Sequence, residues 1–193
     1  DRSSLSVGIA DLSGKLLSEH HEALDPSAGP SEVLERVVIL FNWLLEDQPE
    51  PLQVWAIGLS VPGPIDPPNG TPFPAPRLKA MPAWADFPYV ENLAERFGAP
   101  VWTQGAVQVM TMGELKAGEG RGLDDLLFVE LGRTISAGLV SNGRLHVGAH
   151  GAAGLIGQSF IGPDSLDGLA GSEALAAEAA AAAHDGRSSY LAN

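Results

Sequence analysis

The sequence predicts an α/β protein with two lobes, and three observations support this prediction. Residues 5–11 and 15–20 alternate in polarity around a Ser-Gly turn, which is typical of a β-hairpin. Residues 30–45 begin with Pro-Ser-Glu and then repeat apolar side chains with a helical period. Residues 55–61 form an apolar run of strand length, which predicts a strand buried on both faces of a parallel or mixed sheet.

The middle of the chain predicts the end of the first lobe. Residues 62–88 carry nine prolines, so we expect a long ordered loop and not regular elements. Residues 89–97 predict a short amphipathic helix closed by a glycine, and residues 100–103 predict a short strand. We place the lobe boundary there, which gives an N-terminal lobe of residues 1–103 and a C-terminal lobe of residues 104–193.

The second lobe is expected to open with a helix at residues 107–117, followed by a strand at 126–131. Asn142-Gly143 lies between two runs of strand character, 137–140 and 144–147, and is the clearest hairpin signal in the chain. Residues 148–157 are rich in Gly and Ala and predict a close-packed loop. An Ala-rich helix follows at residues 172–183, with Ser172 as its expected cap.

Composition excludes several classes of function. The 193 residues carry a net charge of −13, which repels phosphate backbones and anionic lipid, so we expect any DNA contact to come from a separate upstream domain. No cysteine is present, so disulfides and thiolate zinc sites are excluded. No stretch has the length of a membrane span, and the first four residues do not resemble a secretory signal. A cytoplasmic protein with no membrane contact is therefore expected.

Two segments follow predicted strands and could bind a ligand. The run Ser60–Asp66 includes Pro62 and Gly63 and ends a strand at a Gly/Pro turn, where open α/β sheets place their ligands. Asp66 could act as a base, although a carboxylate beside Pro and Gly is more often a turn former. Residues 132–138 form a second turn of small residues, of the kind whose backbone N–H groups bind phosphate.

Two further segments have weaker signals. His146 and His150 are four residues apart, but the glycine between them argues against a helix that would place both on one metal. The junction Thr103–Gln108 would project polar groups into a cleft between the lobes. It contains no group that could take a proton near neutral pH, so it offers no general base.

The order of these segments resembles the ROK family of repressors and sugar kinases. The resemblance is carried by matching segments along the whole chain, namely Asp11–Gly14, Gly58–Asp66, Phe97–Trp102, Gly113-Glu114, Gly120–Gly122, Gly138–His146 and Gly148–Gly157. It implies an actin-like, ribonuclease H-like ATPase fold with two lobes and mixed sheets. It also implies a site for sugar and ATP in the cleft.

The sequence departs from the family pattern at the residues that the resemblance assigns to catalysis. Where members carry an acidic residue and then Asn-Asp-x-Asn, this chain has Gln104–Gln108, so Ala106 stands in place of the catalytic Asp. Loss of a positioned base removes about 10² to 10⁴-fold of rate. We therefore expect no kinase activity and no catalytic residue.

The family's phosphate and zinc motifs are altered in the same way. The phosphate turn starts with Gly132, Arg133 and Thr134 and has lost two glycines, so ATP binding is doubtful. Leu155 and Gln158 replace a sugar-binding Glu and a zinc-ligating His, and no Cys-rich loop follows, so zinc is not expected either. The residues that we expect to contact a ligand are Pro62, Gly63, Gln104, Gly105, His150, Leu155 and Gln158.

Three functions remain open from the sequence. The first is the ligand-sensing and oligomerisation domain of a ROK-type transcriptional regulator. We expect such a domain to be a homodimer that binds a sugar or another small effector. The second is an active sugar kinase of the glucose type, with Asp66 or Glu114 as the base. The third is an assembly module with no small ligand. The resemblance also implies that the opening strand lies before residue 1 and that the second lobe is incomplete.

Overall fold

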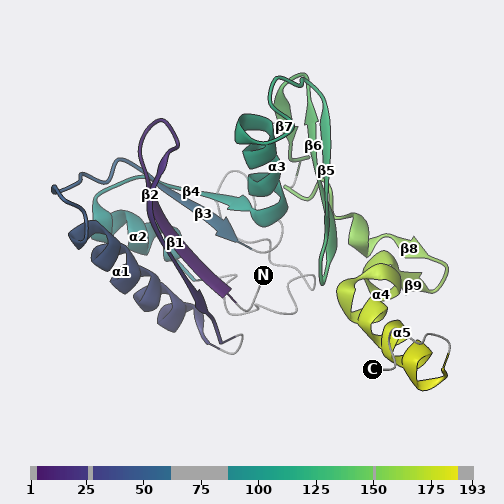
Figure 1. Cartoon of the computed structure of the whole chain (residues 1–193). Coiled ribbons are helices and arrows are strands. Elements are labelled where there is room, and N and C mark those ends of the chain that lie inside the picture. Colours follow the sequence, from purple (N-terminus) through teal and green to yellow (C-terminus); the bar gives the residue numbers. More distant parts are fainter. Residues whose placement is uncertain (1–3, 26–27, 62–86, 150, 187–193) are drawn as a thin grey trace. The chain divides into compact units, whose positions relative to one another are not determined.

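The computed structural model describes residues 4–25, 28–61, 87–149 and 151–186. They form two compact units, residues 1–105 and 106–193, so the observed division lies two residues beyond the predicted boundary. Figure 1 shows the elements of both units. No helix among the described residues is long and apolar enough to cross a membrane.

The first unit opens with the predicted hairpin. Strands β1 (Ser4–Ala10) and β2 (Leu16–Ala23) are antiparallel, with a register shift between Ile9 and Ala10. The turn is held by Asp11, whose carboxylate accepts from the backbone N–H groups of Ser13 and Lys15 at 2.8 and 3.0 Å. The pKa of the Asp11 carboxyl is lowered chiefly by a hydrogen bond from the Ser13 hydroxyl at 2.6 Å, and then by these backbone hydrogen bonds.

Two helices cover one face of the first unit's strands. Helix α1 (Pro30–Glu46) begins with Pro30 in its first turn, as predicted, and buries a stripe of Val and Leu side chains. Helix α2 (Tyr89–Phe97) ends at Gly98, which adopts φ +61°. Both pack with strand β3 (Ile57–Val61) in one core that includes the fully buried Leu93.

Strand β3 pairs in parallel with β4 (Val101–Gly105), so of the parallel or mixed sheet that the sequence predicts for β3, the parallel pairing is present. The prediction that β3 is buried on both faces is wrong. Gly58 and Ser60 are exposed, and Trp55 just before the strand is 66% exposed. The reason is that α1 and α2 cover only one face of this strand pair, while the apolar composition alone could not indicate which faces are covered.

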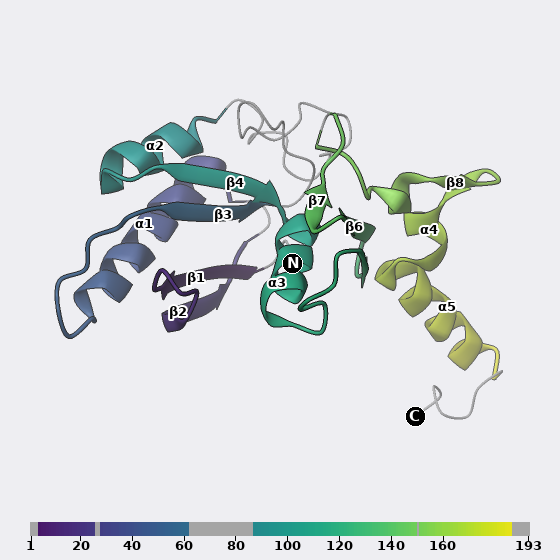
Figure 2. The ribbon, with the colours of Figure 1, turned by 90° about the horizontal axis from the view of Figure 1, so that it is seen from above.

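The second unit is a helix packed on a three-stranded sheet, followed by a small helical end. Its elements are α3 (Ala106–Ala117), β5 (Leu126–Leu131), β6 (Ile135–Ser141) and β7 (Arg144–His146), then the 3-10 helix η2 (Ile156–Gln158), β8 (Phe160–Ile161), β9 (Asp164–Ser165), α4 (Leu166–Ala170) and α5 (Ser172–His184). Figure 2 gives a second view of this order.

The predicted Asn142-Gly143 hairpin is confirmed, since both residues have positive φ and join β6 to antiparallel β7. The sheet order is β5-β6-β7. The expected cap of α5 is wrong in detail. Gly171 is the N-cap and Ser172 is the first helical residue, because the Ser172 backbone N–H donates to the carbonyl of Gly132 at 2.9 Å.

Candidate functional site

The carboxyl ends of β3 and β4 lie side by side in the first unit. The parallel register pairs Ser60 with Gln104 and Val61 with Gly105, so both strands end at the same edge. In open α/β sheets this edge is where ligands bind. The predicted site residues Gln104 and Gly105 lie there. Pro62, Gly63 and Asp66, which follow β3, lie outside the described residues.

Strand β4 runs directly into helix α3, whose first residue is Ala106. The first turn of α3 contains no acidic residue. The methyl group of Ala106 can neither accept nor donate a proton, so the residue at this junction cannot serve as a general base. The structure thus places Ala106 at the start of the helix, where the sequence comparison expects a catalytic carboxylate.

Gln108, two residues further along α3, has a structural role. Its side chain is 3% exposed, and its Nε2 donates to the backbone carbonyl of Gly151 at 3.3 Å. This hydrogen bond ties the helix to the 148–157 segment, which carries the predicted contact Leu155. His150, next to Gly151, lies outside the described residues, so the predicted pair with His146 stays a prediction.

The predicted phosphate turn is shorter than the motif suggested. Only Gly132, Arg133 and Thr134 form the turn, and the residues after it belong to β6. Gly138 lies inside β6, where a Cβ would come within 1.7 Å of Thr111 Oγ1 on helix α3. This glycine therefore allows α3 to pack closely on β6, and it lies within the strand and not in the predicted turn of residues 132–138.

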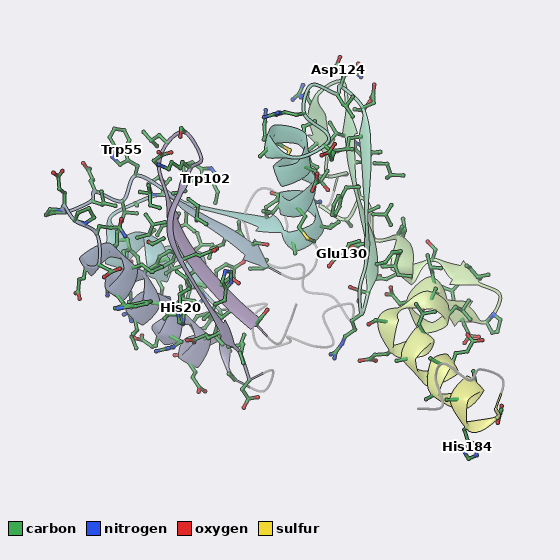
Figure 3. All side chains as sticks on the ribbon, viewed as in Figure 1. His20, Trp55, Trp102, Asp124, Glu130 and His184 are labelled. Carbon is green, nitrogen blue, oxygen red and sulfur yellow. The ribbon has the colours of Figure 1, made fainter. Side chains whose placement is uncertain are left out.

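A carboxylate lies beside the same turn, and the sequence analysis did not single it out. Glu130 precedes the turn on β5 (Figure 3), and its Oε2 accepts a hydrogen bond from Ser136 Oγ at 3.0 Å. Its other carboxylate oxygen would lie 3.6 Å from a Cβ built on Gly132. A negative charge this close to the turn opposes phosphate binding. The run Leu126–Leu131 shows no alternation of polar and apolar residues, so no sequence signal marks this position.

The Arg133 side chain of this turn already forms an ion pair with an acidic side chain. Arg133 Nε lies 3.1 Å from Glu173 Oε1, and both side chains are largely exposed. The backbone at the start of α5 is also engaged, through the hydrogen bond from Ser172 to Gly132. Arg133 thus points to a carboxylate on α5, and the pair is of the weak, solvent-screened kind.

The segment after β7 is packed against β6 with little free space, as the sequence predicted. Gly154 has φ +89°, and a Cβ there would lie 1.7 Å from the backbone oxygen of Ala137. The backbone N–H of Ala137 donates to the Gly154 carbonyl at 2.8 Å. Leu155 is half-buried just before η2 and Gln158 is exposed at its end.

Asp167 fixes the same region from helix α4. Its Oδ1 accepts from the backbone N–H of Ile135 at 2.6 Å, and Gly157 lies so close that a Cβ there would overlap this carboxylate. The short strands β8 and β9 and helix α4 were not predicted from the sequence. They occupy the place where the family pattern would have led us to expect a zinc loop.

The alternative base Glu114 lies at the far end of α3. It is eight residues from Ala106, which is about 12 Å along a helix axis. Its carboxylate accepts from the backbone N–H of Glu119 at 3.2 Å. Among the described residues, no group of three His, Asp or Glu side chains is placed to hold a metal ion.

Comparison with known proteins identifies the class. The ROK family profile matches residues 2–186, and the chain belongs to this family. A ROK transcriptional regulator of known structure, a homologue of the E. coli MLC protein, superimposes with a TM-score of 0.79 at 19% identity, over 96% of this chain and 48% of that one. The predicted actin-like fold class is confirmed by this family membership.

Relatives of both functional kinds are similar to the chain. The xylose repressor of Caldicellulosiruptor bescii is 26% identical over 81% of this chain and 39% of its own length. The glucokinase of Thermotoga maritima is 27% identical over 83% of this chain and 49% of its own length. The chain therefore spans half or less of the length of these relatives, and family membership alone does not decide between repressor and kinase.

Proposed function

We propose that this chain is the effector-binding part of a ROK-type transcriptional regulator, built on a sugar-kinase scaffold that does not transfer phosphate. The proposal is carried by Ala106, which begins helix α3 at the junction where a catalytic carboxylate is expected. Without a base at that position, a bound sugar hydroxyl has no group to accept its proton.

The electrostatics of the turn at 132–134 support the same proposal. The Glu130 carboxylate lies beside Gly132, and Arg133 is paired with Glu173. A nucleotide phosphate would meet one fixed negative charge and a cation that already has a partner. Repulsion between the Glu130 carboxylate and a phosphate at this turn would weaken nucleotide binding. Absence of ATP and zinc from the functional protein is part of the proposal.

The ligand is proposed to be a sugar or a related small molecule, as in the family's repressors. The contacts proposed for it are those at the shared edge of β3 and β4, with Gln104 and Gly105, and those of the 148–158 segment, with Leu155 and Gln158. Binding would act by favouring one arrangement of the lobes over another, since a ligand shifts an equilibrium only through its differential affinity. DNA contact through a separate domain and a homodimeric state belong to the same proposal.

Isothermal titration of the protein with a panel of hexoses, pentoses and their N-acetylated derivatives tests the proposal. We expect one class of sugar to bind, and we expect titration with ATP to give no heat of binding. A protein that is folded, dimeric and silent toward the whole panel would instead favour the assembly module. In that case no sugar would raise the melting temperature either.

A further inference from the structure

The exposed face of the β1–β2 hairpin carries a serine, a histidine and a glutamate in contact with one another. Ser6 of β1 lies opposite His21 of β2 in the antiparallel register. Ser6 Oγ is 2.7 Å from His21 Nδ1, and His21 Nε2 is 3.0 Å from Glu19 Oε2. The imidazole therefore bridges a hydroxyl and a carboxylate through its two ring nitrogens.

Strand alternation explains why these three side chains share one face. Successive side chains of a strand point to opposite faces, so Glu19 and His21 lie on one face of β2, and the cross-strand partner Ser6 lies on the same face. Val7, on the other face of β1, is buried against helix α1. The His21 and Glu19 side chains are 61% and 50% exposed. The paired backbone thus fixes the group while leaving it open to a reactant from solvent.

The carboxylate decides which ring nitrogen of His21 carries the proton. An ionised Glu19 can only accept hydrogen bonds, so the neutral imidazole has its proton on Nε2 and donates it to Glu19. Nδ1 then keeps its lone pair and accepts from the Ser6 hydroxyl. A hydroxyl bonded to a base that a third group orients is the arrangement that activates serine as a nucleophile. The two nitrogens exchange the roles that they have in serine proteases, and the proton transfer is the same.

We propose that Ser6 is a nucleophile that activated aryl esters acylate, with His21 as its general base and Glu19 as a positioning residue. Ser6 Oγ bonds to the acyl carbon, and its proton passes to His21 Nδ1. The phenolate leaves with the electron pair of the broken C–O bond and takes up the proton from the imidazolium.

Hydrolysis of the acyl-serine completes the reaction with the same groups. Water attacks the acyl carbon and gives a proton to His21 Nδ1, and Ser6 Oγ leaves with the bonding pair and recovers that proton. The net change is ester and water to carboxylic acid and phenol. None of the residues proposed to contact a sugar takes part, so this activity does not depend on effector binding.

Exposure limits the reaction to esters with a good leaving group. On an open face water meets the developing oxyanion, and losing one fixed hydrogen-bond donor to an oxyanion costs about 10²–10³-fold in rate. A positioned general base contributes about 10²–10⁴-fold. We therefore expect acylation by p-nitrophenyl esters and none by amides.

The same hairpin supplies two matched controls. Ser13, in its turn, is an exposed serine whose Oγ donates to Asp11 Oδ1 at 2.6 Å, so its partner is a carboxylate and not an imidazole. His20 lies on the opposite face of β2, with its Nε2 3.1 Å from Glu22 Oε2. S13A and H20Q therefore remove a hydroxyl and an imidazole of the hairpin without changing the proposed group.

The test incubates the 193-residue chain with p-nitrophenyl acetate, quenches it with acid and locates the acetyl group by mass spectrometry. We expect the label on Ser6, with release of p-nitrophenolate. S6A should abolish this label, and H21Q should slow the labelling of Ser6 by about 10²-fold. S13A and H20Q should leave the labelling rate of Ser6 near that of the parent.

The role of Glu19 is tested by the tautomer of His21, which the NMR shifts of the ring nitrogens report. The parent should hold the proton on Nε2. E19A should give a mixture of both tautomers and slower labelling of Ser6, whereas E19Q keeps an acceptor oxygen and should retain the Nε2 tautomer with a smaller loss of rate. These side chains are exposed, so thermal unfolding of each variant should stay close to that of the parent.

Four outcomes would overturn the proposal. The first is a folded parent that gains no label on Ser6. The second is a label on His21 with unchanged phenolate release in S6A, which would make the imidazole itself the nucleophile. The third is labelling of Ser13 as fast as Ser6, and the fourth is H21Q labelled at Ser6 at the parent's rate. Either of the last two would show that His21 does not activate Ser6.

Discussion

Replacing Gly138 by alanine tests whether this glycine of the family's phosphate motif serves helix packing. The new Cβ would lie 1.7 Å from Thr111 Oγ1 and 2.6 Å from Thr111 Cβ, and Thr111 is fully buried. Overpacking of this kind costs about 1–3 kcal/mol, and the lower chain entropy of alanine offsets about 0.4–1 kcal/mol of it. We expect a net loss of about 1–2 kcal/mol, or roughly 5–15 °C in melting temperature for a unit of this size.

The assay is thermal unfolding of Gly138→Ala, of Gly132→Ala and Thr111→Ala as single variants, and of the Gly138→Ala/Thr111→Ala double variant. Gly132→Ala, in the same motif, meets only ordinary contacts at 3.6 Å and should change stability by less than about 0.5 kcal/mol. Thr111→Ala removes the clashing hydroxyl and should relieve about 1 kcal/mol of the Gly138→Ala cost in the double variant. Equal effects of the two glycine variants, or no relief in the double variant, would refute the packing role.

Three further predictions concern single contacts. Gly154→Ala should lower the free energy of unfolding at least as much as Gly138→Ala, because its Cβ would meet the backbone oxygen of Ala137 at 1.7 Å and φ is +89°. No side-chain substitution should restore the loss, since the clash is with backbone. A free energy of unfolding in denaturant within about 0.5 kcal/mol of the parent would contradict this. Asp167→Ala should lower the free energy of unfolding by about 1–3 kcal/mol because it leaves the buried backbone N–H of Ile135 unpaired, whereas Asp167→Asn keeps an acceptor and should lower it less. Equal losses for the two variants in urea unfolding would argue against this role. Arg36 lowers the pKa of the Glu22 carboxyl to about 2 through two hydrogen bonds, so the pair contributes stability above about pH 4.5 that is lost as pH falls through about 2. NMR titration of Arg36→Gln should therefore move the Glu22 midpoint up toward 4.5, and a midpoint that stays near 2 would exclude Arg36 as the cause.

Elements defined by local chemistry could be predicted from the sequence. The β1–β2 hairpin, helix α1 and the Asn142-Gly143 turn each depend on residues within a few positions of one another. Strand β3 shows the limit of prediction from local sequence. Its apolar run predicted its existence, but its exposed face depends on which helices pack on it, and that is a tertiary property.

The candidate site shows the same division. That Ala106 stands where the family pattern has a catalytic Asp came from the resemblance to the family, because an Ala at a strand-to-helix junction carries no signal of its own. The structure places Ala106 at the start of α3. The role of Gly138 could not be predicted from the sequence, since it depends on Thr111 approaching from another element. Glu130 was missed because a lone carboxylate in an apolar strand carries no motif, and only the pairing of β5 with β6 shows its hydrogen bond with Ser136 across the turn.

Sugar phosphorylation measured together with sugar binding tests the central claim most directly. The protein is titrated with the sugar panel by calorimetry, and every sugar that binds is then incubated with ATP and magnesium while sugar phosphate is quantified. The account predicts binding of at least one sugar with no sugar phosphate above the enzyme-free control. Turnover that disappears in Glu114→Gln or Asp66→Asn would contradict it, because it would show an active kinase that uses another base in place of the residue lost at Ala106.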